Sequence, residues 1–298
     1  MSDNKMSRGK AIKTMLAGGL ALGAGAAHAK MNPRYDEETI RNYQIKGNIN
    51  HSACRWCYRD IELEDLVKAC KDMGLKAIDL LNPPEWEVAT KQGLEVSMSF
   101  GSSLGIPRGF NDPQYHEQLQ KEFKELIPKA ADAGLKRIIC FSGNRNGMSD
   151  EQGLENCAIG LEPVVKLAQK HNITIIMELL NSKVNHPDYM CDLTPWGVAL
   201  TEKVGSDHFK LLYDIYHMQI MEGDVIATIK KYNKYFDHYH TGGVPGRNEI
   251  DETQELYYPA IMRAILDTGY TGYVAQEFIP KHNDPLVSLK EAVMICDV

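Results

Sequence analysis

Four residues that can bind a metal ion each end a short β-like segment in the second half of the chain. They are Glu178, Asp214, His240 and Glu277. An ionised carboxylate at the end of a buried segment is costly unless it is paired or bound to a cation. Taken alone, Asp214 could instead cap a turn, and His240 could be a hydrogen-bonded core histidine. Four such residues at equivalent places favour one shared divalent-metal site.

The chemistry of this set follows from its ligand atoms. Three carboxylates and one imidazole suit Mn²⁺ best, while Mg²⁺, Co²⁺ or Zn²⁺ also fit, and positions stay open for substrate oxygens. A carbonyl oxygen and the neighbouring hydroxyl of a substrate can both bind such a cation. The cation then stabilises the enediolate that forms when the α-proton leaves. The set therefore predicts aldose–ketose chemistry.

Eight β-like segments alternate with eight amphipathic segments from Tyr43 onward. The predicted strands span residues 44–50, 77–80, 95–99, 137–141, 174–178, 210–214, 236–240 and 273–277. The predicted helices span residues 62–73, 85–92, 115–133, 154–171, 195–204, 224–232, 259–267 and 286–295. Eight βα units with no strand left over predict a single (β/α)₈ TIM barrel, whose active site lies at the carboxyl ends of the strands.

An open doubly wound sheet is the main alternative fold. Such sheets usually carry a glycine-rich turn after their first strand, whereas residues 50–55 contain no glycine. The net charge of −7, without a basic cluster beyond the N-terminus, argues against a nucleic-acid partner. Seven scattered cysteines, of which Cys54 and Cys57 form a lone C-x-x-C, favour ordinary thiols over a disulfide scaffold.

Residues 1–29 are typical of an export signal peptide. Basic residues between positions 5 and 13 precede a weakly apolar run, and Ala27-His28-Ala29 has the form of a signal-peptidase site. Residues 7–13 resemble a twin-arginine signal with Gly9 at the second arginine, which leaves the export route open. We expect cleavage near Ala29 and a periplasmic catalytic domain, residues 30–298, without a stable membrane span.

Three later segments carry a family resemblance. Residues 211–219 (LLYDIYHMQ), 240–247 (HTGGVPGR) and 269–278 (GYTGYVAQEF) resemble the hydroxypyruvate isomerase group of the xylose isomerase-like barrel superfamily. The similarity runs from about Gln44 to the C-terminus. The resemblance implies that the four residues above are metal ligands, and that Glu178 and Glu277 flank the substrate as acid and base.

The resemblance extends to substrate contacts. His217 and Arg247 match residues that bind substrate oxygens in relatives, and a guanidinium suits a carboxylate or a row of hydroxyls. Lys183 lies in a loop that should face the barrel mouth, and Trp56 is a candidate apolar wall. His240 departs from hydroxypyruvate isomerases, which typically have glutamine there, and agrees with ketose epimerases.

These features predict a metal-dependent isomerase or epimerase that moves a proton between adjacent carbons of a small carbohydrate or hydroxy-carbonyl substrate. A dehydratase or lyase acting on a keto-sugar, and an exported sugar-binding barrel without catalysis, remain alternatives. Phosphodiester cleavage like that of endonuclease IV has little support from the acidic composition. The sequence leaves open whether the protein forms a homo-oligomer.

Overall fold

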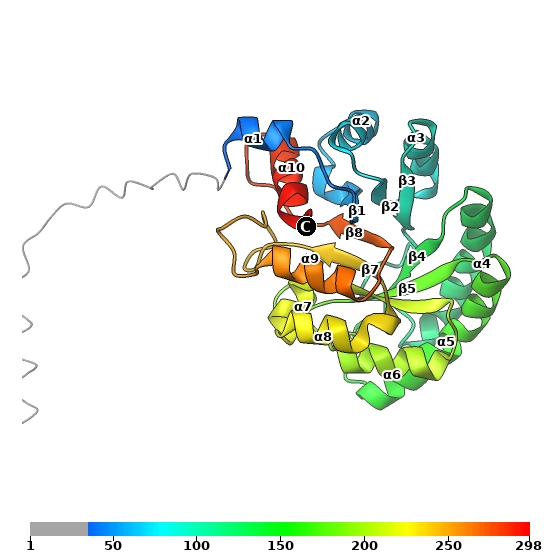
Figure 1. Ribbon diagram of the computed structural model, residues 1–298. Coiled ribbons are helices and arrows are strands. Elements are labelled where there is room, and N and C mark those ends of the chain that lie inside the picture. The colour runs from blue at the N-terminus through cyan, green and yellow to red at the C-terminus, as the bar shows by residue number, and fades with distance from the viewer. Residues whose placement is uncertain (1–34) are drawn as a thin grey trace, which may run out of the picture. The chain divides into compact units, whose positions relative to one another are not determined.

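Eight parallel strands close into a barrel in chain order, and β1 completes the ring by pairing with β8 (Figure 1). The computed structural model describes residues 35–298, so the predicted signal peptide lies outside the described residues. The strands are β1 Asn50–Cys54, β2 Ala77–Leu81, β3 Glu95–Ser99, β4 Arg137–Cys140, β5 Thr174–Leu179, β6 Phe209–Asp214, β7 Phe236–Thr241 and β8 Tyr273–Gln276. The predicted (β/α)₈ barrel is therefore confirmed.

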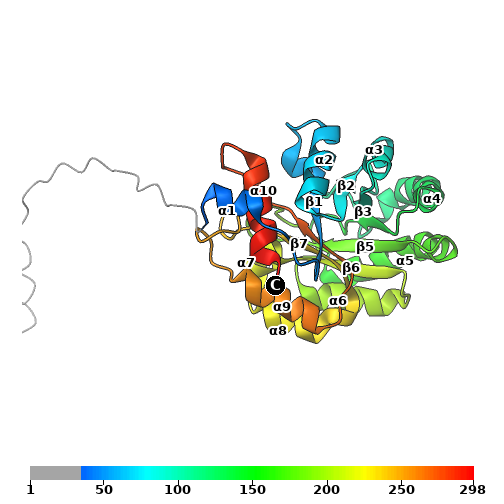
Figure 2. The same ribbon diagram turned by 45° about the horizontal axis from the view of Figure 1, so that its top comes forward.

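Helices surround the strands on the outside of the barrel (Figure 2). They are α1 Glu37–Asn42, α2 Leu63–Met73, α3 Trp86–Lys91, α4 His116–Asp132, α5 Asp150–Lys170, α6 Thr194–Val204, α7 Ile215–Met221, α8 Val225–Tyr232, α9 Tyr258–Asp267 and α10 Pro285–Cys296. Short 3₁₀ helices cover Arg55–Tyr58, Pro83–Glu85, Pro113–Tyr115 and Asn233–Tyr235. None of the helices within residues 35–298 is long and apolar enough to cross a bilayer.

The helices form where one face can be buried against the strands. In α2, Leu66, Val67 and Cys70 are fully buried, while the other face is charged. Gly74 ends this helix with a φ of 90°, a left-handed conformation that glycine adopts without a steric penalty. This helix thereby turns back into β2.

Side chains fill the inside of the barrel below its mouth. One buried cluster contains Leu80, Met98, Ile139, Ile176 and Leu212, which come from five neighbouring strands. A barrel of eight strands has an interior just wide enough for such side chains. The functional residues at the strand ends therefore lie above a densely packed barrel interior.

The first strand was predicted in the wrong place. Residues 44–50 were expected to form it, whereas β1 spans Asn50–Cys54. Gly47 has a φ of 83°, which interrupts an extended strand, and Ile45 packs against the main core from outside the sheet. The residues assigned to a loop after the strand are the strand itself. The other seven strands lie within one residue of their predicted ends.

Candidate metal centre

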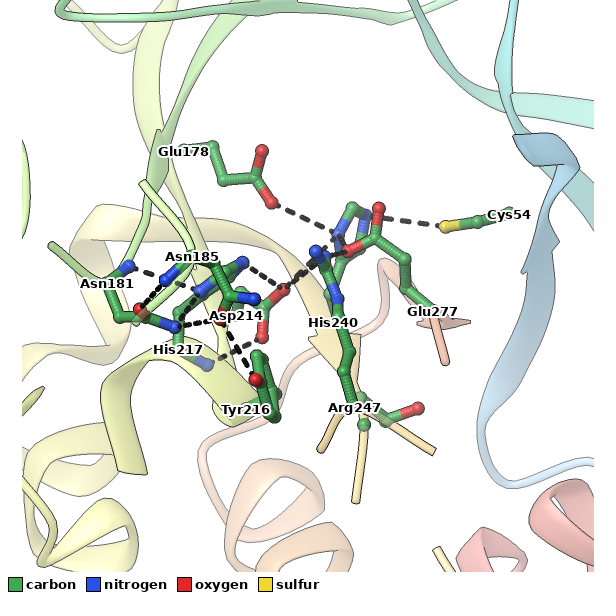
Figure 3. Close-up of polar contacts among 12 residues, drawn as sticks. Cys54, Glu178, Asn181, Asn185, Asp214, Tyr216, His217, His240, Arg247 and Glu277 are labelled. Atoms are coloured by element: carbon green, nitrogen blue, oxygen red, sulfur yellow. Dashed lines mark hydrogen bonds and ion pairs between the residues drawn. The ribbon is translucent and has the colours of Figure 1, made fainter. Parts of the chain in front are cut away.

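The structure brings the four predicted ligands together at the mouth of the barrel (Figure 3). Glu178 is the second-last residue of β5, Asp214 ends β6, His240 lies in β7, and Glu277 directly follows β8. All four are buried, and one potential ligand atom from each lies within 4.8 Å of the others. The register explains the convergence, because Asp214 pairs with His240 across neighbouring strands.

His240 faces the three carboxylates through its Nδ1 atom. This atom lies 2.8 Å from Glu277 Oε2, 3.4 Å from Glu178 Oε1 and 4.0 Å from Asp214 Oδ2. Within the described residues, Glu178 Oε1 is buried without a hydrogen-bond partner. Buried oxygens are rarely left without a partner, so this atom fits a ligand of a cation. The donor set as a whole matches a divalent metal.

Asp214 has two functions in the structure. Its Oδ1 accepts a hydrogen bond of 3.0 Å from the backbone N–H of His217 and so caps α7, which begins at the next residue. Its Oδ2 faces His240. The capping role considered from the sequence and the ligand role are therefore compatible, because each uses a different oxygen.

The crowding of buried carboxylates shifts their pKa values in different directions. Burial raises the pKa of Glu178, and the charge of Glu277 adds to this effect. Burial also raises the pKa of Asp214, to about 8, although the positive charge of Arg247 opposes it. Burial alone would raise the pKa of Glu277 as well, but the charges of Arg247 and His240 hold it well below its usual range. Of the three carboxylates, Glu277 is thus the one whose ionised form is favoured by its protein partners.

Arg247 supplies a fixed positive charge beside the ligands. Its Nη2 contacts Glu277 Oε2 and lies 3.4 Å from Asp214 Oδ2. The guanidinium lies between aromatic rings, 5.1 Å from the centre of Trp56 and 5.5 Å from that of Tyr216. These contacts place the predicted substrate residue Arg247 directly at the site.

Trp56 makes a polar contact that the sequence did not suggest. Its indole Nε1 donates a hydrogen bond of 2.6 Å to Glu277 Oε1. The predicted apolar wall is therefore also a donor that orients one of the ligands. Oε1 of Glu277 accepts the hydrogen bond from Trp56, and Oε2 contacts His240 and Arg247.

His217 has a defined protonation. Its Nδ1 accepts a hydrogen bond of 3.1 Å from the backbone N–H of Asn181, so in the neutral ring Nε2 carries the proton. This Nε2 lies 3.6 Å from Asp214 Oδ2. Burial lowers the pKa of His217 well below its usual value, so the ring is a neutral donor at the edge of the site.

Lys183 lies apart from the four ligands. Its Nζ donates hydrogen bonds to the backbone carbonyls of Ile220 and Met221, at 3.0 and 2.9 Å. These carbonyls lie at the C-terminal end of α7, where a positive charge is favourable. In this structure Lys183 holds its loop to α7, and it is not brought to the candidate metal centre.

A polar layer that the sequence did not predict lies directly below the ligands. Asp79, His238 and Cys54 are fully buried inside the barrel and contact one another or His240. The available signal was Asp79 itself, an acidic residue in the middle of the apolar strand Ala77–Leu81. A carboxylate inside a buried strand requires donors, so Asp79 itself indicates polar partners within the barrel.

The fold and the site together define a class: a TIM barrel with a candidate metal centre of three carboxylates and one histidine at its mouth. More specifically, the chain belongs to the xylose isomerase-like TIM barrel family, whose model matches residues 49–294. The predicted family resemblance is therefore confirmed.

Two relatives illustrate the range of similarity. A human protein named as a candidate hydroxypyruvate isomerase is 25% identical over 240 residues, which cover 76% of this chain and 78% of that protein. The hydroxypyruvate isomerase of Escherichia coli is 28% identical over 170 residues, or 57% of this chain and 65% of that enzyme.

Solved structures share the fold at low identity. An AP endonuclease of family 2 from Brucella melitensis has a TM-score of 0.72 at 20% identity, covering 78% of this chain and 95% of that one. The 3-keto-D-glucoside 4-epimerase of Escherichia coli has a TM-score of 0.70 at 16% identity, covering 83% and 98%. The IOLI protein with a bound zinc atom has a TM-score of 0.66 at 15% identity, covering 83% and 95%.

Proposed function

We propose that this protein is a metal-dependent isomerase or epimerase that moves a proton between adjacent carbons of a small hydroxy-carbonyl or sugar substrate. The observation that carries the proposal is the convergence of Glu178, Asp214, His240 Nδ1 and Glu277 within 4.8 Å. The named activity of the Escherichia coli relative is an isomerisation of this kind. A non-catalytic sugar-binding barrel would not need a pair of buried glutamates at the same point.

The same four residues would hold one divalent cation. When bound, the cation would act as a Lewis acid that polarises the substrate carbonyl and stabilises an enediolate. Mn²⁺ is our first choice because three of the four ligands are carboxylates. The zinc atom in the IOLI structure makes Zn²⁺ the main alternative.

Glu178 and Glu277 are proposed as the groups that move the proton. Glu178 Oε1 has no hydrogen-bond partner among the described residues, so this carboxylate is less constrained than that of Glu277 and can accept or donate a proton. Glu277 is instead held by Trp56, His240 and Arg247, which favour its ionised form. In the metal-free protein the two glutamates thus favour different protonation states, as an acid and a base on two sides of a substrate must.

Arg247 and His217 are proposed to orient the substrate. The guanidinium can bind a carboxylate or neighbouring hydroxyls, and the Nε2–H of His217 can donate to one further oxygen. Because His240 replaces the glutamine typical of hydroxypyruvate isomerases, we place free ketoses beside hydroxypyruvate among the first substrates to test.

Proton exchange with D₂O tests this function directly. The Mn²⁺-loaded protein is incubated with a panel of ketoses and hydroxyaldehydes, and deuterium at the carbon next to the carbonyl is followed by NMR. We expect exchange with the wild type and its loss in Glu178→Gln and in Glu277→Gln. The exposed Glu64→Gln on α2 is a matched control that should exchange normally.

The same experiment separates the alternatives. Release of water and a dicarbonyl product would identify a dehydratase. Absence of exchange on every compound would favour the binding protein, and normal exchange in either active-site variant would refute the mechanism.

A further inference from the structure

Asp79 is a fully buried carboxylate that lies beneath the candidate metal centre. Its Oδ2 lies 2.9 Å from His240 Nε2 and accepts a hydrogen bond of 3.4 Å from Cys54 Sγ. Its Oδ1 accepts a hydrogen bond of 2.5 Å from Ser97 Oγ and lies 3.1 Å from His238 Nε2. Side chains from β1, β3 and β7 thus surround both oxygens. A carboxylate with so many donors is ionised and fixed in orientation.

His240 connects this carboxylate to the predicted ligands. One ring nitrogen, Nδ1, faces the three outer carboxylates, and the other, Nε2, faces Asp79. A neutral imidazole carries one proton, and only its unprotonated nitrogen can bind a metal. A proton held on Nε2 by Asp79 leaves the lone pair of Nδ1 directed at the cation position.

We propose that Asp79 is a positioning residue that fixes the ring orientation and the Nε2–H tautomer of His240, and that Ser97 and Cys54 hold Asp79 in place. The inference rests on the proposed function, because it assigns His240 Nδ1 as a metal ligand. Replacing a carboxylate that accepts the second N–H of a ligating histidine typically lowers metal affinity by about 10- to 100-fold.

A second cation is the competing explanation for this layer. Ligand atoms of Cys54, Asp79 and His240 also lie within 4.8 Å of one another. However, a second cation would need Nε2 of the same ring that the first cation binds through Nδ1. Cys54 is also fully buried next to apolar residues, a setting in which a thiol stays protonated. It donates a hydrogen bond to Asp79. We therefore expect one metal ion per chain.

The test compares Mn²⁺ affinity and stoichiometry in the wild type and in Asp79→Asn, by competition with a chromophoric chelator. The amide can donate to Nε2 and so favours the opposite tautomer, and we expect affinity to fall by about 10- to 100-fold. Asp192→Asn is the matched control, since Asp192 is another buried carboxylate, paired with Arg145 at 2.8 Å. It should keep wild-type affinity even if it lowers the melting temperature.

Different outcomes identify different failures. Equal affinity in wild type and Asp79→Asn overturns this inference alone, and two ions per wild-type chain do the same. A wild type that binds no divalent metal overturns both this inference and the proposed function.

If Asp79→Asn does not fold, the tautomer can be measured in the wild type. In ¹⁵N-histidine-labelled protein loaded with diamagnetic Zn²⁺, the ring of His240, assigned with His240→Gln, should carry its proton on Nε2. A proton on Nδ1 would overturn the inference.

Discussion

Arg247 places one positive charge where both a metal ion and a substrate act. Its guanidinium contacts Glu277 and lies 3.4 Å from Asp214, so it neutralises part of the charge that would attract a cation. The same group is the strongest candidate for binding substrate oxygens. Metal binding and substrate binding should therefore respond to Arg247 in opposite directions.

We predict that Arg247→Met binds Mn²⁺ at least about tenfold more tightly, because a nearby like charge is removed. The same variant should raise KM by about tenfold, because a charge-assisted hydrogen bond is lost. Metal titration and steady-state kinetics measure the two effects. Arg263→Met, on the exposed side of α9, is a control that should change neither. Weaker metal binding in Arg247→Met would contradict the geometry.

The pH dependence follows from the buried acids. Asp214 loses its proton near pH 3.8 in the unfolded chain and near pH 8 in the folded, metal-free protein. Between these values the folded state binds the additional proton, so its stability falls as pH rises. The raised pKa values of Glu178 and His240 act in the same direction. Glu277 acts oppositely, but only below its ordinary pKa of 4.5. Burial also lowers the pKa of three histidines, which opposes the trend below their ordinary pKa of 6.5; they are His51, His217 and His238.

We therefore predict that the melting temperature in chelator decreases from pH 7 to pH 8, while the apparent Mn²⁺ affinity increases over the same range. Metal binding displaces the protons. Each proton released increases the apparent metal affinity by up to about tenfold per pH unit. Thermal unfolding and metal titration at three pH values provide the test. A metal-free protein that becomes more stable toward pH 8 would show that the carboxylates are already ionised.

The candidate site was predictable to the extent that its residues end strands. Glu178, Asp214 and Glu277 could be found because the end of a barrel strand fixes where a side chain points. Lys183 lies four residues beyond β5, and its position depends on a hydrogen bond to α7 that no strand pattern predicts. Asp79 was missed because it lies within a strand.

At the scale of elements, the alternation of strands and helices was predictable and the first strand was not. β1 contains His51 and Ser52, which are buried polar residues and do not resemble a strand of a barrel interior. The short helices α1 and α7 were also missed, since six or seven residues hold too few turns to show a periodic pattern.

The end of α2 offers a test of the segment that was misassigned. A Cβ added at Gly74 would lie 2.8 Å from Cδ1 of Ile45, at a backbone φ of +90°. Gly134 has a similar φ of +85° and no heavy atom within 4 Å of an added Cβ. We predict that Gly134→Ala costs about 1–2 kcal/mol from backbone strain, and that Gly74→Ala costs more because Ile45 must move.

Urea denaturation of both variants measures the difference. Equal losses would mean that Ile45 is not packed against this turn.

At the scale of the whole molecule, the export of the chain is a proposal that rests on residues 1–29. We predict that the mature protein begins near Lys30 and is found in the periplasmic fraction, which fractionation and mass spectrometry of the N-terminus would establish. Replacing Ala27 and Ala29 with leucine should leave an uncleaved precursor. Recovery of full-length wild type in the cytoplasm would refute the proposal. Arg8→Lys, which should block only the twin-arginine route, separates the two export pathways.

The indole of Trp56 gives the protein an optical property. It is the one tryptophan that contacts a predicted ligand, since the indoles of Trp86 and Trp196 donate instead to the backbone carbonyls of Leu81 and Asp150. Both the hydrogen bond to Glu277 and the stacked charge of Arg247 alter the emission of an indole. A cation held by Glu277 and the other three ligands would alter these contacts and change the intrinsic fluorescence of the chain, so occupancy of the site could be followed without any label.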